Sequence, residues 1–303
     1  MAKAPTKLRS HKERLQSLYG GMFPSQESLR RATALRQKAF TADFKRQEAS
    51  RAEYAALTRK LQAPMIEAYR KDTGALEHIR KIQALSTASV KRKLSPPRIP
   101  VHAPRIVADL GATVVAPYDF EEVLLSSAGS PFNDSSAQKA TGKITSTLSW
   151  NNANASSGSV TVGVGIFFHP PTDCPGTLKI SSSVAYSSRW STYSMFAGAH
   201  SDGWLGLSVE RFTINGFPDG VLIDQRFFLW SNDSSWVGGP VAIQGSNTGF
   251  PLFAQCGVDS QHSYHVWVRG GGSVSSAGFG GPFSSFATSQ IFGTVPSIAW
   301  ELV

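Results

Sequence analysis

The segment that decides the fold runs from Gly158 to Phe168 and reads GSVTVGVGIFF. Every second residue is a large apolar one, and up to Ile166 the residues between them are Ser, Thr or Gly. Because successive side chains of a β-strand point to opposite faces, this alternation predicts a strand with one buried face. The apolar face consists of Val160, Val162, Val164, Ile166 and Phe168.

The same alternation recurs on both sides of this segment. It is clear in 143–150, 204–214, 221–230, 264–269 and 297–303, and weaker in 106–115, 178–186 and 241–243. Clusters of Gly, Pro, Ser, Asn and Asp separate these segments, and helical patterns between them are missing. About nine short strands at such spacing predict an antiparallel β-sandwich, similar to a jelly roll, over residues 106–303.

A helical pattern precedes the strands. Ser25 predicts an N-cap, and residues 26–62 are rich in good helix formers with apolar residues at helical spacing. Pro64 should break or kink this helix, and a further helical segment covers 75–85. The apolar stripes are narrow, which predicts packing of the helices against each other or against other copies of the chain.

Composition divides the chain into four parts. A flexible basic arm (1–24) leads into a helical oligomerisation or docking region (25–94), a Pro-rich linker (95–105) and the β-sandwich domain (106–303). The linker reads SPPRIPVHAPR and favours an extended polyproline II conformation, typical of a spacer. Its P-x-x-P motif also matches an SH3-type ligand. The expected fold class is therefore α+β multidomain.

Charge divides the chain in the same way. Residues 1–110 hold 23 Lys+Arg and 9 Asp+Glu, whereas residues 111–303 hold 7 and 12. The basic part predicts an anionic partner, nucleic acid or an acidic protein, held without sequence readout. The alternative is a solvated helix surface. The candidate contact residues are Lys3, Lys7, Arg9, Lys12, Arg14, Lys91, Arg92 and Lys93.

The sequence contains no recognisable catalytic or metal-binding motif. There is no G-x-S-x-G elbow, no P-loop lysine and no zinc-finger spacing, so we expect no enzyme activity, no cofactor and no metal. His200 and Asp202 share a face if their segment is extended, but they make only two ligands. Glu210 lies on the polar side of its strand and is interpreted as solvated.

The two cysteines have no companion ligands. Cys174 and Cys256 are interpreted as small buried hydrophobes, with a single disulfide as the alternative.

A candidate binding surface comes from the segment 264–269. His265, Trp267 and Arg269 share one face, and the other face is Tyr264, Val266 and Val268. If the aliphatic face is inside, the first three residues are exposed and suit contacts with a sugar or a protein. The alternative is that Trp267 belongs to the core. Further candidates in or beside polar loops are Trp190, Tyr193, Trp204 and Trp236.

The leading functional interpretation is a non-enzymatic assembly and binding protein. The helical part mediates oligomerisation or docking to an anionic or scaffold partner, and the sandwich recognises a glycan or a protein. The alternatives are a capsid-like structural protein with a nucleic-acid-binding arm, a membrane-active pore-forming β protein and a hydrolase on a β-sandwich. The first alternative resembles small RNA virus coat proteins in layout alone. With no signal peptide or membrane-spanning stretch apparent, we expect a soluble protein.

Overall fold

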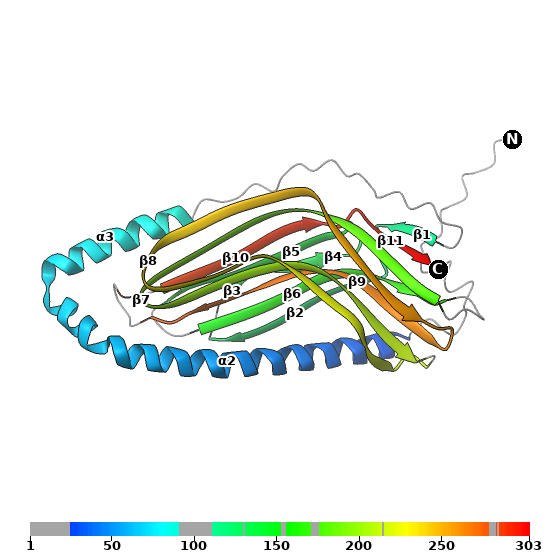
Figure 1. Ribbon diagram of the computed structural model, residues 1–303, viewed down its shortest axis with the longest axis horizontal. Helices are drawn as coiled ribbons and strands as arrows, with labels where there is room; N and C mark the ends of the chain where they lie inside the picture. Colours follow the sequence, from blue (N-terminus) through cyan, green and yellow to red (C-terminus); the bar gives the residue numbers. More distant parts are fainter. Residues whose placement is uncertain are drawn as a thin grey trace.

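A computed structural model describes most of the chain. The described residues are 25–90, 111–129, 131–152, 156–170, 176–213, 215–278, 283 and 285–303. They form a helical segment followed by an antiparallel β-sandwich, which confirms the expected fold class (Figure 1). The arm 1–24 and the linker 95–105 lie outside the described residues.

Two helices lie in the N-terminal part, α2 (Gln26–Lys71) and α3 (Thr73–Val90). The Ser25 hydroxyl accepts a hydrogen bond from the Ser28 amide at 3.1 Å, which confirms the predicted N-cap. Pro64, which was expected to break or kink the helix, does not break it, because α2 continues through it to Lys71. We attribute this to tertiary packing, since the fully buried Ile66 anchors the turn that follows the proline.

Eleven strands are defined among the described residues. Their bounds are β1 Gly111–Val115, β2 Phe120–Ala128, β3 Phe132–Asn133, β4 Ser136–Gln138, β5 Lys143–Asn152, β6 Ser156–Phe168, β7 Gly176–Thr213, β8 Pro218–Val258, β9 His262–Ser276, β10 Ser285–Thr294 and β11 Ser297–Leu302. Their pairings are all antiparallel.

Several expected short strands are parts of longer ones. Residues 178–186 and 204–213 both belong to β7, and residues 221–230 and 241–243 both belong to β8. The strands β2 and β10 were not expected at all. Asn215-Gly216, a dipeptide typical of turns, lies between β7 and β8, and Gly216 has a φ of 76°.

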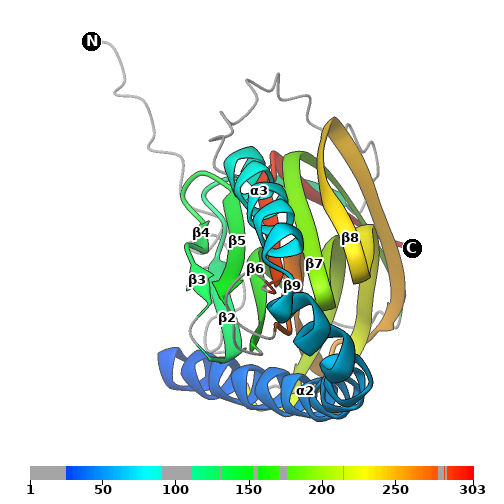
Figure 2. The same ribbon diagram turned by 90° about the vertical axis from the view of Figure 1, so that its left-hand side faces the viewer.

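The long strands β7 and β8 run through both sheets of the sandwich. The C-terminal part of β7 pairs with β9, next to β6 and β2, and forms one sheet. The N-terminal part of β7 pairs with β10 and β11, and β10 pairs with β5 in the other sheet. Figures 1 and 2 show the two layers and the long β7–β8 pair that connects them.

The core lies between these layers. The apolar face predicted for β6 is buried, as are its neighbours from β5, β7, β9 and β10. The glycines of β6 allow close packing on the opposite face, because a Cβ at Gly165 would lie 2.8 Å from the Trp267 ring.

Helix α2 lies along the outer face of the sheet that contains β2, β6 and β9 (Figures 1 and 2). Near its N-terminus Leu29 packs beside Phe120, Phe167 and Trp267. Near its C-terminus the helix joins a second apolar cluster, whose buried members are Ile66, Ile79, Tyr193, Phe283 and Phe286. The buried face of α2 therefore packs on the sandwich, which the sequence did not predict. At Ile66 it also packs on Ile79 of α3, in agreement with the expected packing of the helices against each other.

The close approach of strands at Gly271 gives a test of the fold. A Cβ there would overlap the Val160 carbonyl oxygen and the Trp204 ring, whereas a Cβ at Gly257 would meet nothing within 4 Å. We expect Gly271→Ala to lower the free energy of unfolding by about 1–3 kcal/mol. Gly257→Ala is the matched control and should change it little. Chemical denaturation of both variants checks this, and equal midpoints would contradict the described register.

Candidate functional site

Four charged side chains meet beneath α2 in an alternating ring. Glu122 of β2 accepts hydrogen bonds from Arg36 Nε of α2 and Arg269 Nε of β9, each at 2.7 Å. Glu210 of β7 accepts from Arg36 Nη1 and Arg269 Nη2, also at 2.7 Å each. Each carboxylate thus joins both guanidinium groups, and the formal charges cancel. We call Arg36, Glu122, Arg269 and Glu210 the charge ring.

The indole of Trp267 lies against this ring. The guanidinium carbons of Arg36 and Arg269 lie 5.0 and 5.1 Å from the indole centroid. The indole Nε1 donates to Glu210 Oε2 at 3.2 Å. Cation–π attraction and this hydrogen bond therefore bind Trp267 to the protein's own charges.

His265 is also buried, among the rings of Phe120, Phe212 and Trp267. Burial, with the positive charges of Arg36 and Arg269, lowers the pKa of His265 well below 6.5. Neither ring nitrogen has a hydrogen-bond partner. His265 is therefore a neutral packing residue without access to solvent.

The expected exposure of His265, Trp267 and Arg269 is wrong. Their exposed fractions are 1%, 1% and 8%, because α2 covers the outer face of β9. Burial alone would lower the Arg269 pKa, but Glu122 and Glu210 offset this and raise it. Glu210, interpreted from the sequence as solvated, is 5% exposed because it belongs to the charge ring.

The other aromatic candidates are not brought together at a surface. Trp190 stacks on Trp230 with centroids 6.3 Å apart, and Tyr193 stacks on Phe286 at 5.4 Å. Trp204 is buried, with the Arg226 guanidinium 4.7 Å from its ring centroid. Each has an intramolecular packing role. The backbone of Trp236 pairs with Ala197, and its side chain lies outside the description.

The basic residues proposed for an anionic partner remain a prediction. Lys3, Lys7, Arg9, Lys12, Arg14, Lys91, Arg92 and Lys93 all lie outside the described residues, as does Cys174. Cys256 is a free, half-buried thiol, and burial raises its pKa to about 11.

A second polar group surrounds His200 of β7. Its Nε2 lies 3.0 Å from Asp202 Oδ2, and its Nδ1 lies 2.8 Å from Asp233 Oδ1. The predicted shared face of His200 and Asp202 is confirmed. Asp202 also accepts hydrogen bonds from the amide and hydroxyl of Ser273, at 2.7 and 2.5 Å. With both ring nitrogens facing carboxylates, His200 has none left to activate a hydroxyl.

No cluster of three or more His, Cys, Asp or Glu able to hold a metal occurs within the described ranges. In the same part of the chain, no helix is long and apolar enough to cross a membrane.

The outer edge of β8 is the third notable feature. Among the described strands, β8 hydrogen-bonds only to β7. Residues 241–249 of β8 are exposed, and they include the apolar side chains of Val241 and Ile243. We call residues 241–250 the β8 edge segment.

Comparisons with known proteins add little to this geometry. Neither a family model nor a curated protein matches the chain. Among solved structures, the xylan-binding CBM22-1 domain of Paenibacillus barcinonensis Xyn10C is 14% identical, with a TM-score of 0.15, over 57% of this chain and 85% of that domain. The Endo-D glycoside hydrolase domain of Streptococcus pneumoniae R6 is 7% identical (TM-score 0.17; 59% and 21% covered). A chain of infectious bursal disease virus Gt strain is 13% identical (TM-score 0.13; 61% and 41% covered). Scores this low carry no functional argument.

The charge ring predicts a strong effect of Arg36→Gln. Removing one guanidinium leaves an oxygen of Glu122 and one of Glu210 buried without their cation, so we expect a loss of about 3 kcal/mol in the free energy of unfolding. Arg31→Gln is the control, because its ion pair with Glu27 is exposed and should contribute less than about 1 kcal/mol. Hydrogen exchange over α2 should increase only in Arg36→Gln. Similar losses in both variants would contradict the role of the ring.

His200 predicts a pH dependence of stability. Burial would lower its pKa, but Asp202 and Asp233 offset this and raise it above the unfolded value of 6.5. Protonated His200 therefore stabilises the fold fully below pH 6.5, and this contribution is lost as pH rises through the folded pKa. We expect His200→Gln to cost more stability at about pH 5.5 than at about pH 9. An NMR titration that places the His200 pKa below 6.5 would contradict this.

Proposed function

We propose that the protein is a non-enzymatic assembly protein whose copies associate through the outer edge of β8, which pairs with no other described strand than β7. The observation that supports this most is the β8 edge segment, in which a long strand ends a sheet with exposed apolar side chains. An unpaired edge presents a row of N–H and C=O groups that another strand can complete. Two copies of this chain can pair antiparallel along it in a symmetric dimer.

The composition of β8 supports this role. Its only charged residue between Phe227 and Val258 is Asp233, and no lysine interrupts the edge. Natural proteins protect edges with charges, prolines or short strands. Here Pro240 and Pro251 flank the β8 edge segment and leave its ten residues free of both proline and charge. By contrast, the edge strand β2 carries an exposed charge at Glu121.

The arrangement of polar groups supports the non-enzymatic part of the proposal. His265 is sealed from solvent, and both nitrogens of His200 face carboxylates. Within the described residues, neither imidazole is hydrogen-bonded to a hydroxyl that it would activate as a nucleophile.

The test is the mass of the full chain in solution. Light scattering should give a multiple of the 32.6 kDa chain mass. Ile243→Lys should weaken association about tenfold or more, because it places a charge on the pairing edge. Leu61→Lys is the matched control, because Leu61 is 82% exposed but lies on α2. A monomeric wild type, or equal effects of both variants, would reject the proposal.

The capsid-like alternative adds nucleic acid to this assembly, and the excess of basic residues in 1–110 favours it. The same solution experiment separates the two functions. Nucleic acid that copurifies with the oligomer and dissociates steeply with salt supports the capsid-like function. An oligomer without it supports assembly alone.

A further inference from the structure

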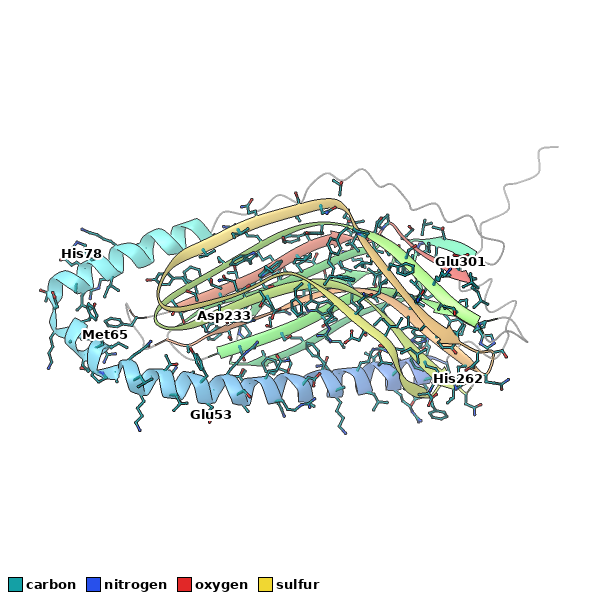
Figure 3. All side chains as sticks on the ribbon, viewed as in Figure 1. Glu53, Met65, His78, Asp233, His262 and Glu301 are labelled. Carbon is teal, nitrogen blue, oxygen red and sulfur yellow. The ribbon has the colours of Figure 1, made fainter. Side chains whose placement is uncertain are left out.

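A cavity of about 500 Å³ lies between the middle of α2 and the ends of several strands. Strands β6, β7, β8 and β9 contribute its opposite wall. In Figure 3, the labelled Asp233, which lines this cavity, lies on the side of the sandwich that faces α2. This volume falls in the range of small-molecule sites in proteins.

Small side chains on both walls account for the cavity. α2 presents Ala52 and Ala55, and the strands present Gly198, Ala199 and several serines. The helix is held on both sides of this place, by the charge ring at Arg36 and by the apolar cluster at Ile66. The unfilled space is therefore kept open by contacts outside it.

Three residues that line the cavity carry polar atoms without a hydrogen-bond partner. Arg51 Nη1 and Arg59 Nε are buried and have no partner. Another guanidinium nitrogen of Arg59 donates to the Gly278 carbonyl at 3.2 Å, which fixes the side chain. Ser276 is 4% exposed, and its hydroxyl also has no partner. Unsatisfied buried polar atoms are costly, so a ligand that accepts hydrogen bonds from them is favoured.

The acidic groups of the cavity are already engaged. Glu48 accepts a hydrogen bond from the Ser157 hydroxyl, and Asp233 faces His200. The free groups are therefore two guanidinium donors, whose planar forks match carboxylate and phosphate oxygens. Serine residues also line the cavity, namely Ser156, Ser234, Ser275 and Ser276.

We propose that this cavity binds an acidic sugar, whose carboxylate or phosphate contacts Arg51 and Arg59 and whose hydroxyl groups contact the serines. The oxyanion satisfies the guanidinium nitrogens, and a hydroxyl satisfies the Ser276 oxygen. This site does not depend on association through β8.

Calorimetric titration of the full chain with four probes tests the proposal. Glucuronate and glucose 6-phosphate should bind. Glucose should bind at least about tenfold more weakly than either acid, because it lacks the negative charge that the guanidinium groups recognise. The tighter of the two acids identifies the oxyanion as carboxylate or phosphate. Equal binding of glucose and both acids overturns the role of the arginines. Inorganic phosphate binding as tightly as glucose 6-phosphate overturns the sugar component, and no binding by any probe overturns the site.

Binding measurements on four variants test whether the probes bind in the cavity. Arg51→Gln and Arg59→Gln should each weaken binding of the acidic probes about tenfold. Arg46→Gln is the matched control, because Arg46 is exposed on the same helix and does not line the cavity. Ala55→Trp should abolish binding by filling the space. Unchanged affinity in Arg51→Gln, Arg59→Gln and Ala55→Trp overturns the proposal.

Two further measurements keep the test independent of folding and of assembly. In the wild-type protein, the imidazole NMR signals of His200, which lines the cavity, should shift when an acidic probe is added. Signals that stay unchanged at saturation place the probe elsewhere and overturn the site. The Ile243→Lys variant should bind the probes with the same affinity as the wild type. The assembly proposal and the ligand proposal can therefore fail independently of each other.

Discussion

The charge ring beneath α2 is the interaction on which the arrangement of helix and sandwich depends. Taking four charges out of water is expensive, and only their alternation and close hydrogen bonds offset that cost. The ring joins α2, β2, β7 and β9, so it fixes where the helix lies on the sheet. Trp267 packs against both guanidinium groups of the ring. We therefore regard the ring as a determinant of position more than as a source of net stability.

The sequence predicted the inner faces of the sandwich well. In β6 and β9, alternation identified the residues of the inner face, because apolar periodicity reports directly on the face that is covered by the core. Prediction of strands from alternation failed where polar residues occur inside long strands. The Ser231–Asp233 cluster resembles a turn, yet it continues β8 because Asp233 faces His200 and the strand lies at an edge. In β2, the two consecutive glutamates Glu121 and Glu122 interrupt the alternation of apolar and polar residues, so this strand was not predicted.

The candidate site was harder to predict for a different reason. Arg36 lies 86 residues from Glu122 and 174 from Glu210, so no local pattern connects them. Alternation showed that His265, Trp267 and Arg269 are opposite the aliphatic face. The further step, that the opposite face meets solvent, assumed that only one face of the sheet is covered. A sheet with a helix on its second face breaks that assumption.

The positive charge of the N-terminal part therefore serves several purposes. Arg36 is neutralised inside the charge ring, whereas Arg31 and Arg46 pair with exposed acids at the surface. Arg51 and Arg59 differ from both kinds, because they turn toward the sandwich and keep buried donors without partners. These arginines contribute equally to the net charge, but they differ in burial and in hydrogen-bond partners. An anionic ligand for α2 is thus expected where guanidinium nitrogens are buried without a hydrogen-bond partner, and not along the whole basic helix.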